Sequence, residues 1–441
     1  MTAEKTPAEL RIDARWVVPV EPAGVVLEDY SVVVRDGKIL ALLPSSEAGN
    51  AFASREQITL ERHVLIPGLV NLHTHAAMTL MRGLADDRPL MEWLKGHIWP
   101  VEAAHMSPEF VYDGTLLACA EMLRGGITCA NDMYFFPEAA ARAFLDAGMR
   151  ASIGLIAVEF PSTYATDADS YIAKGLAVRD RFGAEPTLSF CMAPHAPYTV
   201  SDRTFARLAT LAEELDLPVH VHLHETDDEI RASLEAHGRR PVERLAALGL
   251  VSPRLIGVHA VHLTAAEIAL LSLNQCSIAH CPSSNLKLAS GFAPIAALLE
   301  AGVNVGLGTD GAASNNRLDV LQEMRTAALL AKAVAGRADA LPAHAALRCA
   351  TLGGARALGL DRVIGSIVPG KAADLCAVSL DGPGSLPCYD PVSHLVYACG
   401  RDDVSHVWVA GQAVLEDRTL LRIDNRMLEK RTGLWQNRLG R

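Results

Sequence analysis

Eight short apolar runs of strand-like composition alternate with helical or loop segments from residue 67 onward. Several intervening segments, such as SDRTFARLATLAEELD and TAAEIALLSL, repeat apolar residues near the 3.6-residue period of a helix. Eight strand–helix units within about 250 to 300 residues predict an α/β fold, a (β/α)8 TIM-type barrel. The runs are LIPGLVNLHTH, GITCANDMYF, RASIGLIAVEF, PTLSFCMAPHAPY, PVHVHLHET, LIGVHAVHL, CSIAHCPSSN and VNVGLGTDG.

The two ends of the chain have a different, β-rich pattern. Asp36-Gly37 lies between two apolar runs and predicts a β-hairpin. Strand-like sequence returns in SIVPGKAADLCAVS and VSHVWVAGQAVLEDR. We expect both ends to pair into one small β-sandwich. Residues 1–66 would form its N-terminal part, 67–362 the barrel, and 363–441 its C-terminal part and a tail.

Composition excludes several partners and compartments. The net charge of -11 argues against nucleic acid and anionic membranes, and no stretch approaches the ~20 apolar residues of a membrane span. The polar start MTAEKTPAELRIDARW predicts no signal peptide. Nine dispersed cysteines without a CxxC pair favour a reducing, cytoplasmic setting. The sequence leaves the oligomeric state open, including a homo-oligomer.

Histidines concentrate at the predicted strand ends. His73 and His75 are two residues apart in a strand, so both point to one side, as a transition-metal site requires. A pair of hydrogen-bonded structural histidines would look the same, but the same rim collects many more polar residues. Since barrel active sites lie at this rim, we expect a functional site there. These residues are His73, His75, His195, His220, His222, His224, Glu225, His259, His262, His280 and Asp310.

The fifth run, HVHLHET, places three histidines at alternate positions. His220, His222 and His224 therefore point to one side, and not all of them can bind one ion. A zinc ion needs three or four nitrogen or oxygen ligands and one open position. His73, His75, one histidine of this run and Asp310 would supply that set. We interpret His220 and His224 as packing or orienting residues, and His280 as a hydrogen-bonded residue beneath the site.

The motifs PGLVNLHTH, APHAPYTVSD, HVHLHET, AHCPSSNLKLASG and GLGTDGAASNN, in this order, resemble those of the amidohydrolase superfamily. The chain is most similar to the branch that holds 5'-methylthioadenosine and S-adenosylhomocysteine deaminases, beside the triazine hydrolases. The resemblance covers nearly the whole chain, to SIVPGKAADL. It implies a (β/α)8 barrel with a β-sandwich from both termini.

The resemblance also implies roles for individual residues. The metal ligands would be His73, His75, His222 and Asp310. Glu225 would transfer protons, His259 would orient the attacking water and Asp310 would be the base; His195 and Glu102 would contact the nucleoside, Glu102 through the ribose hydroxyls. Binuclear relatives carry a carboxylated lysine on a middle strand, and TLSFCMAPHAPY has none. We therefore expect one divalent ion per subunit, zinc.

The expected activity is hydrolytic deamination at C6 of an adenosine derivative. The segment ASIGLIAVEFPSTYATDADSYIAKGLA has no arginine for the carboxylate of S-adenosylhomocysteine. Phe160, Pro161 and Tyr164 would instead line an apolar pocket, so 5'-methylthioadenosine is the expected substrate, with S-adenosylhomocysteine and adenosine secondary. An arginine from another loop or subunit stays open; the candidates are Arg82, Arg88 and Arg240.

Two alternatives remain. A related amidohydrolase would act on guanine, cytosine or a triazine with a similar metal site, although Glu102 and His195 favour a nucleoside. A non-catalytic binding protein on the same fold would show gaps among the ligand and proton-transfer residues, and none is visible. The HxE…PCxxC pattern of cytosine-type zinc deaminases is absent.

Overall fold

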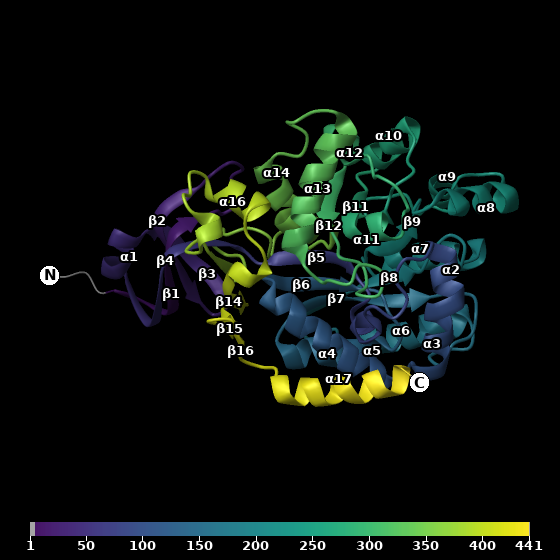
Figure 1. The fold of residues 1–441 in the computed structure, drawn as a ribbon, viewed down its shortest axis with the longest axis horizontal. Coiled ribbons are helices and arrows are strands. Elements are labelled where there is room, and N and C mark those ends of the chain that lie inside the picture. Colours follow the sequence, from purple (N-terminus) through teal and green to yellow (C-terminus); the bar gives the residue numbers. More distant parts are fainter. Residues whose placement is uncertain (1–4, 441) are drawn as a thin grey trace.

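The computed structural model describes residues 5–440, which form two eight-stranded sheets and the helices around them (Figure 1). One sheet is a parallel barrel and the other is built from both ends of the chain. The predicted fold class is therefore confirmed. Residues 1–4 and 441, which the prediction assigned to the terminal domain, lie outside the described residues. Within residues 5–440, no helix is long and apolar enough to cross a membrane.

The barrel strands follow one another in chain order from β5 to β12, and every resolved pair is parallel. The first and last strands meet where the amide of Asp310 donates to the carbonyl of His73 at 3.0 Å. Nearby, the amide of Thr309 donates to Oδ1 of Asn71 at 2.9 Å. These contacts bring two segments, 238 residues apart in sequence at Asn71 and Thr309, to one point of the rim. The strands are β5 Leu69–Thr74, β6 Ile127–Asp132, β7 Arg150–Ala157, β8 Leu188–Pro194, β9 Val219–Leu223, β10 Leu255–His259, β11 Ser277–His280 and β12 Asn304–Leu307.

Helices cover the outside of the barrel, which explains why its strands are buried on both faces. The two helices predicted from periodicity are α7 and α10, and each begins with a side-chain cap, Ser201 and Thr264 respectively. The barrel helices are α4 Pro108–Arg124, α5 Pro137–Ala147, α6 Ala168–Phe182, α7 Asp202–Glu214, α8 Asp227–His237, α9 Pro241–Ala247, α10 Ala265–Leu273, α11 Pro282–Lys287, α12 Ile295–Glu300, α13 Val320–Ala335, α14 Ala343–Arg348, η3 Cys349–Gly353 and α15 Gly354–Ala357.

The terminal sheet has the order β16-β15-β14-β13-β4-β1-β2-β3, and the antiparallel pair β4–β13 joins the two ends of the chain. Strands β1 to β4, β13 and β14 contribute to one apolar core, so the sheet folds back on itself. The predicted hairpin is confirmed: Asp36 and Gly37 have φ of 52° and 72°, as a tight two-residue turn requires. The strands are β1 Thr6–Val17, β2 Leu27–Arg35, β3 Lys38–Pro44, β4 Phe52–Pro67, β13 Leu375–Ser379, β14 Val404–Val409, β15 Gln412–Glu416 and β16 Thr419–Leu420.

The terminal sheet shares an apolar core with the barrel, and a charged pair also joins the two parts. Arg150, at the start of β7, donates to both carboxylate oxygens of Asp374 at 2.9 and 3.1 Å, and both side chains are buried. The domain boundaries at 66 and 363 stay predictions. Figure 1 shows the last helix, α17 Asn425–Leu439, lying along the barrel beside α4. The remaining helices of the terminal parts are α1 Ser45–Ala51, η4 Pro383–Ser385, α16 Pro391–Tyr397 and η5 Arg401–Asp403.

A long excursion follows β5 and forms part of the site. It contains η1 Ala76–Met81, α2 Leu90–Trp93, η2 Leu94–Ile98 and α3 Trp99–His105. Glu102 on α3 and Trp93 on α2 both reach the cavity at the barrel mouth. The excursion therefore adds a wall to the site that the eight strands alone would leave open.

Candidate active site

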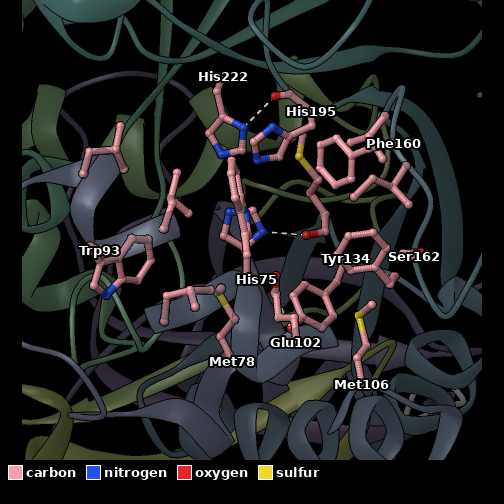
Figure 2. Close-up of a pocket in the computed structure, with 18 of the residues that line it drawn as sticks. His75, Met78, Trp93, Glu102, Met106, Tyr134, Phe160, Ser162, His195 and His222 are labelled. Atoms are coloured by element: carbon pink, nitrogen blue, oxygen red, sulfur yellow. Dashed lines mark hydrogen bonds between the residues drawn. The ribbon is translucent and has the colours of Figure 1, made fainter. Parts of the chain in front are cut away.

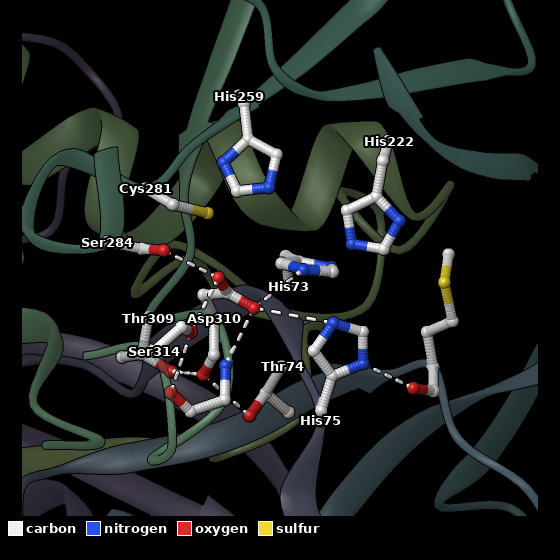
Figure 3. Close-up of polar contacts among 12 residues, drawn as sticks. His73, Thr74, His75, His222, His259, Cys281, Ser284, Thr309, Asp310 and Ser314 are labelled. Atoms are coloured by element: carbon white, nitrogen blue, oxygen red, sulfur yellow. Dashed lines mark hydrogen bonds and ion pairs between the residues drawn. The ribbon is translucent and has the colours of Figure 1, made fainter. Parts of the chain in front are cut away.

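The strand ends of β5, β9, β10 and β12 gather four imidazoles and a carboxylate (Figure 3). Ligand atoms of His73, His222 and His259 lie within 4.8 Å of one another, and so do those of His73, His75 and Asp310. Nε2 of His73 and Nε2 of His75 are each 3.3 Å from Oδ1 of Asp310. The structure thus brings together the four expected ligands, and His259 joins them.

The hydrogen bonds of these histidines leave nitrogen lone pairs for a metal ion. Nδ1 of His75 is 2.5 Å from the carbonyl of Met133, and Nδ1 of His222 is 2.6 Å from the carbonyl of His195. A carbonyl can only accept, so Nδ1 carries the proton and Nε2 is an unprotonated donor atom. Nε2 of His73 is buried and has no hydrogen-bond partner. A buried nitrogen of His73 without a hydrogen-bond partner, beside the unprotonated Nε2 atoms of His75 and His222, fits a metal site.

The charges of the cluster suit a divalent cation. Burial lowers the pKa of His73 to about 4 and holds that of His222 well below its usual range, so both are neutral. Burial alone would raise the pKa of Asp310, but the adjacent His73 and the other nearby imidazoles hold it well below the usual range. Neutral imidazoles and an ionised carboxylate are the forms in which these residues bind metals.

Asp310 is oriented by contacts that sequence reasoning missed. Its Oδ2 accepts hydrogen bonds from Ser284 at 2.6 Å and Ser314 at 2.7 Å, which turns Oδ1 toward the imidazoles. A Cβ on Gly308 would lie 2.8 Å from Cβ of His73, so the strand can approach His73 only with glycine there. The two serines lie in the motifs AHCPSSN and GTDGAASNN. Their presence in these motifs was the only feature of the sequence that could have indicated a role at the site.

His259 ends β10 with a φ of 72°, a strained conformation for a residue with a side chain. Its Nδ1 is 2.8 Å from Oδ1 of Asn285, and its Nε2 is 3.8 Å from Oε1 of Glu225. The Asn285 amide oxygen accepts from Nδ1, which leaves Nε2 of His259 facing the site as an acceptor. Sequence reasoning did not find this role of Asn285.

Glu225 lies just beyond β9 and faces the site. Burial, followed by the charge of Asp310, raises the pKa of Glu225 to about 8, so its carboxyl group holds a proton at neutral pH. Behind it, the carboxylate of Glu229 accepts from the amides of His224 at 3.0 Å and Glu225 at 2.8 Å. Glu229 therefore fixes the turn that presents Glu225.

The other histidines of the rim have separate environments. Nε2 of His220 is 2.9 Å from Nδ1 of His73, which supports the orienting role we expected. The prediction that His224 shares the side of His220 and His222 is wrong, because β9 ends at Leu223 and His224 has a φ of 55°. Its ring instead contacts the carbonyl of His262 and the amide of Val242. His280 is buried and neutral, since burial lowers its pKa to about 3, but its Nδ1 has no hydrogen-bond partner, so the predicted hydrogen bond is not found at that atom.

A cavity of about 290 Å³ opens above the cluster (Figure 2). His75, His195 and His222 line one part of it, and most of the remaining wall is apolar. Glu102 also lines the cavity and accepts a hydrogen bond from Tyr134 at 2.7 Å. Burial raises the pKa of Glu102 to about 7. The cavity thus offers one carboxyl group away from the metal ligands for a polar part of a substrate.

The segment after β7 contributes two of the three predicted apolar residues. Phe160 and Pro161 line the cavity, but Tyr164 does not. The Tyr164 ring instead packs against Phe136 and Tyr171, at centroid distances of 5.1 and 5.7 Å, so its predicted role is wrong. The Tyr164 hydroxyl is buried elsewhere in the fold and cannot contact a ligand in this cavity.

No arginine or lysine among the described residues lines the active-site cavity. Arg82 pairs with Glu121, and Arg88 pairs with Glu92. Arg240 pairs with Glu267 at 2.8 Å. Each of the three arginines considered as a partner for the substrate carboxylate therefore forms an ion pair with a glutamate of this chain.

Comparisons with known proteins agree with this geometry. The "Amidohydrolase family" matches residues 64–414. A 5-methylthioadenosine/S-adenosylhomocysteine deaminase of Saccharophagus degradans is 46% identical over 98% of this chain and 97% of its own. A crystal structure of an adenosine deaminase from Xanthomonas campestris with bound zinc has a TM-score of 0.98 and 50% identity, covering 99% of this chain and 100% of that one.

A more distant structure, the atrazine chlorohydrolase of Arthrobacter aurescens TC1 complexed with zinc, has a TM-score of 0.89 and 26% identity, covering 97% of this chain and 99% of that one. The family match spans the strand ends that carry the metal-ligand cluster, and of the terminal sheet it includes β13, β14 and parts of β4 and β15. The resemblance seen in the sequence motifs is confirmed, and this chain belongs to the amidohydrolase family.

Proposed function

We propose that the protein is a zinc-dependent hydrolytic deaminase of an adenosine derivative, with 5'-methylthioadenosine as its preferred substrate. The observation that carries the proposal is one cavity lined by members of the metal-ligand cluster, by Glu225 and by the separate carboxyl of Glu102. The names of the similar deaminases support the same activity.

A divalent ion held by His73, His75, His222 and Asp310 would lower the pKa of a water molecule from ~15.7 toward ~7. The ionised Asp310 would accept the proton of the attacking water, and Nε2 of His259 would orient it. The protonated Glu225 would donate its proton to a ring nitrogen, which makes C6 of adenine a better electrophile. Asp310 would then pass a proton to the departing ammonia.

Glu102 would hold the ribose. When ionised, its carboxylate is an acceptor for the two hydroxyls of the sugar, and His195 lines the same cavity. A triazine or a free base has no such pair of hydroxyls, so the buried Glu102 favours a nucleoside over these alternatives. The mostly apolar wall that includes Met106 and Phe160 suits the S-methyl group of 5'-methylthioadenosine.

The absence of a cavity arginine makes S-adenosylhomocysteine the slower substrate. Its carboxylate would need a charge-assisted partner, and the described cavity lining has none. One ion per chain is proposed because β8 carries no lysine to bridge a second ion. The homo-oligomer, the lack of a nucleic-acid partner and the cytoplasmic location stay predictions.

The test is a substrate screen with metal analysis. Purified, zinc-loaded protein would be assayed for ammonia release from 5'-methylthioadenosine, S-adenosylhomocysteine, adenosine, guanine and cytosine, and for chloride release from a chlorotriazine. We expect the highest kcat/KM with 5'-methylthioadenosine. A higher value with S-adenosylhomocysteine would overturn the substrate preference, and turnover of only guanine, cytosine or triazine would overturn the nucleoside assignment.

A further inference from the structure

A second, larger chamber adjoins the active-site cavity. It has a volume of about 700 Å³, against about 290 Å³ for the inner cavity. Small-molecule sites usually measure ~300–1,000 Å³, so the inner cavity is near the lower limit. A substrate with a longer tail therefore needs room that the outer chamber can supply.

Three aromatic residues line both chambers, Trp99, Phe160 and Tyr198, and the first two form a close ring pair. Trp99 and Phe160 line both cavities, and their ring centroids are 5.9 Å apart at an angle of 52°. They come from different segments, α3 and the loop after β7, and Phe160 is 38% exposed. Figure 2 labels Phe160 among the residues that line the active-site cavity. A change of the Phe160 rotamer breaks no hydrogen bond, so this pair can part without disturbing the barrel.

The position of Glu102 directs a bound nucleoside toward this aromatic pair. Trp99 and Glu102 are three residues apart on α3, and residues at that spacing lie on the same face of a helix. Both side chains reach the inner cavity. A ribose whose hydroxyls contact Glu102 therefore has its 5' substituent within about one helical turn of Trp99.

The outer chamber contains a cation that suits a carboxylate. Lys95 lines it, is exposed, and forms no ion pair with any residue in the described part of the chain. The other cation of that lining, Arg244, is already bonded to Asp202 and to the carbonyls of Pro197 and Val200. Glu159, Asp228 and Glu229 also line the chamber, but Asp228 pairs with Arg231, and Glu159 and Glu229 accept hydrogen bonds from the backbone amides of Ser201 and Glu225. Lys95 is thus the group that can meet a carboxylate entering the chamber.

We propose that the outer chamber is a subsite for long 5' substituents of the nucleoside, that the Trp99–Phe160 pair controls entry to it, and that Lys95 binds a carboxylate there. The inference rests on the proposed nucleoside substrate. It explains how a chain without a cavity arginine accepts S-adenosylhomocysteine, and why it does so less well than a relative with an arginine fork. A single exposed ammonium binds a carboxylate less specifically than a guanidinium does.

The experiment compares three nucleosides that differ only at the 5' end: 5'-methylthioadenosine, 5'-butylthioadenosine and S-adenosylhomocysteine. Zinc-loaded Phe160→Ala should raise kcat/KM for both longer substrates relative to 5'-methylthioadenosine by at least about fivefold. Lys95→Ala should lower kcat/KM for S-adenosylhomocysteine relative to 5'-methylthioadenosine by about two- to fivefold, as for an exposed ion pair. It should leave the corresponding ratio for 5'-butylthioadenosine unchanged. Phe292→Ala and Lys430→Ala, on exposed residues that line neither chamber, should leave both ratios unchanged.

Calorimetric dissociation constants of the same nucleosides, measured in a Glu225→Gln background, give the same ratios without turnover. If the selectivity pattern is seen in binding but no ammonia is released, the proposed reaction fails and the subsite stands. Equal effects of Phe160→Ala on all three ligands would overturn the aromatic control of entry. Equal effects of Lys95→Ala on the butyl and amino-acid tails would overturn the carboxylate contact, and no nucleoside binding would overturn the subsite itself.

Discussion

Oε1 of Glu225 lies 3.8 Å from Nε2 of His259, at the adjoining ends of β9 and β10. A hydrogen bond fixes each residue. The backbone amide of Glu225 donates to the carboxylate of Glu229, and Nδ1 of His259 donates to Oδ1 of Asn285. A proton donor and a hydrogen-bond acceptor are therefore fixed side by side above the metal-ligand cluster. This pairing suits a reaction that protonates one atom of a ring while water attacks the next.

Replacement of Glu225 by Gln should keep the metal and abolish most turnover. Gln preserves the size of the side chain but has no proton to transfer, so kcat should fall on the order of 10²-fold or more. Metal content and steady-state kinetics check both parts. Glu235→Gln, on the exposed side of α8, is the matched control and should behave like the wild type. A kcat near normal would remove Glu225 from the mechanism.

Loss of a metal ligand should remove metal and activity together. His73→Ala, His222→Ala or Asp310→Ala removes one of the four proposed donors and should weaken the hold on the ion, whereas His344→Ala, on α14 away from both chambers, should change neither property. Metal analysis of the wild type should give one zinc ion per chain. Two ions per chain in fully active protein would contradict the mononuclear site.

The affinity for nucleosides should rise with pH near neutrality. Burial raises the pKa of Glu102 to about 7, so its carboxylate form, the acceptor for ribose hydroxyls, becomes more abundant as pH rises from 6 to 8. KM for 5'-methylthioadenosine should therefore fall over this range in the wild type. The trend should vanish in Glu102→Gln, which has no titratable group.

Glu102→Ala should also weaken nucleosides far more than free bases, because hydrogen bonds to a charged group are worth roughly 1.5–3 kcal/mol each. Parallel measurements of KM or Kd with adenosine and adenine provide the comparison. Equal losses for both ligands would show that Glu102 has no ribose role.

The buried pair of Arg150 and Asp374 should stabilise the contact between barrel and terminal sheet. Arg150→Met leaves a buried carboxylate unpaired, so the free energy of unfolding should fall by about 3–5 kcal/mol. Arg142→Met, which removes a half-exposed pair with Glu138, should cost less than about 1 kcal/mol. Urea denaturation measures both. A double variant, Arg150→Met with Asp374→Leu, should recover part of the loss; equal costs for the two single arginine variants would refute the role of the buried pair.

The sequence predicted the features that follow from periodicity and strand ends. Alternating strands and helices specified the barrel, and the i, i+2 spacing of His73 and His75 located the cluster correctly. The residues that the sequence did not reveal depend on how loops and helices fold around the strand ends. Ser284 reaches Asp310 from α11, and Ser314 does so because the loop after β12 folds back on Asp310. Local spacing also failed at His224, where a positive φ ends the alternation, and at Tyr164, whose loop turns its ring into the fold.

The most direct test of the central claim is the stoichiometry of 5'-methylthioadenosine conversion by the zinc-loaded protein. Nucleoside loss and ammonia release would be followed in the same reaction, with Glu225→Gln as the inactive control. The account predicts one ammonia and one inosine-type product for each nucleoside consumed. Fully metal-loaded protein that released no ammonia from 5'-methylthioadenosine, S-adenosylhomocysteine or adenosine would contradict it.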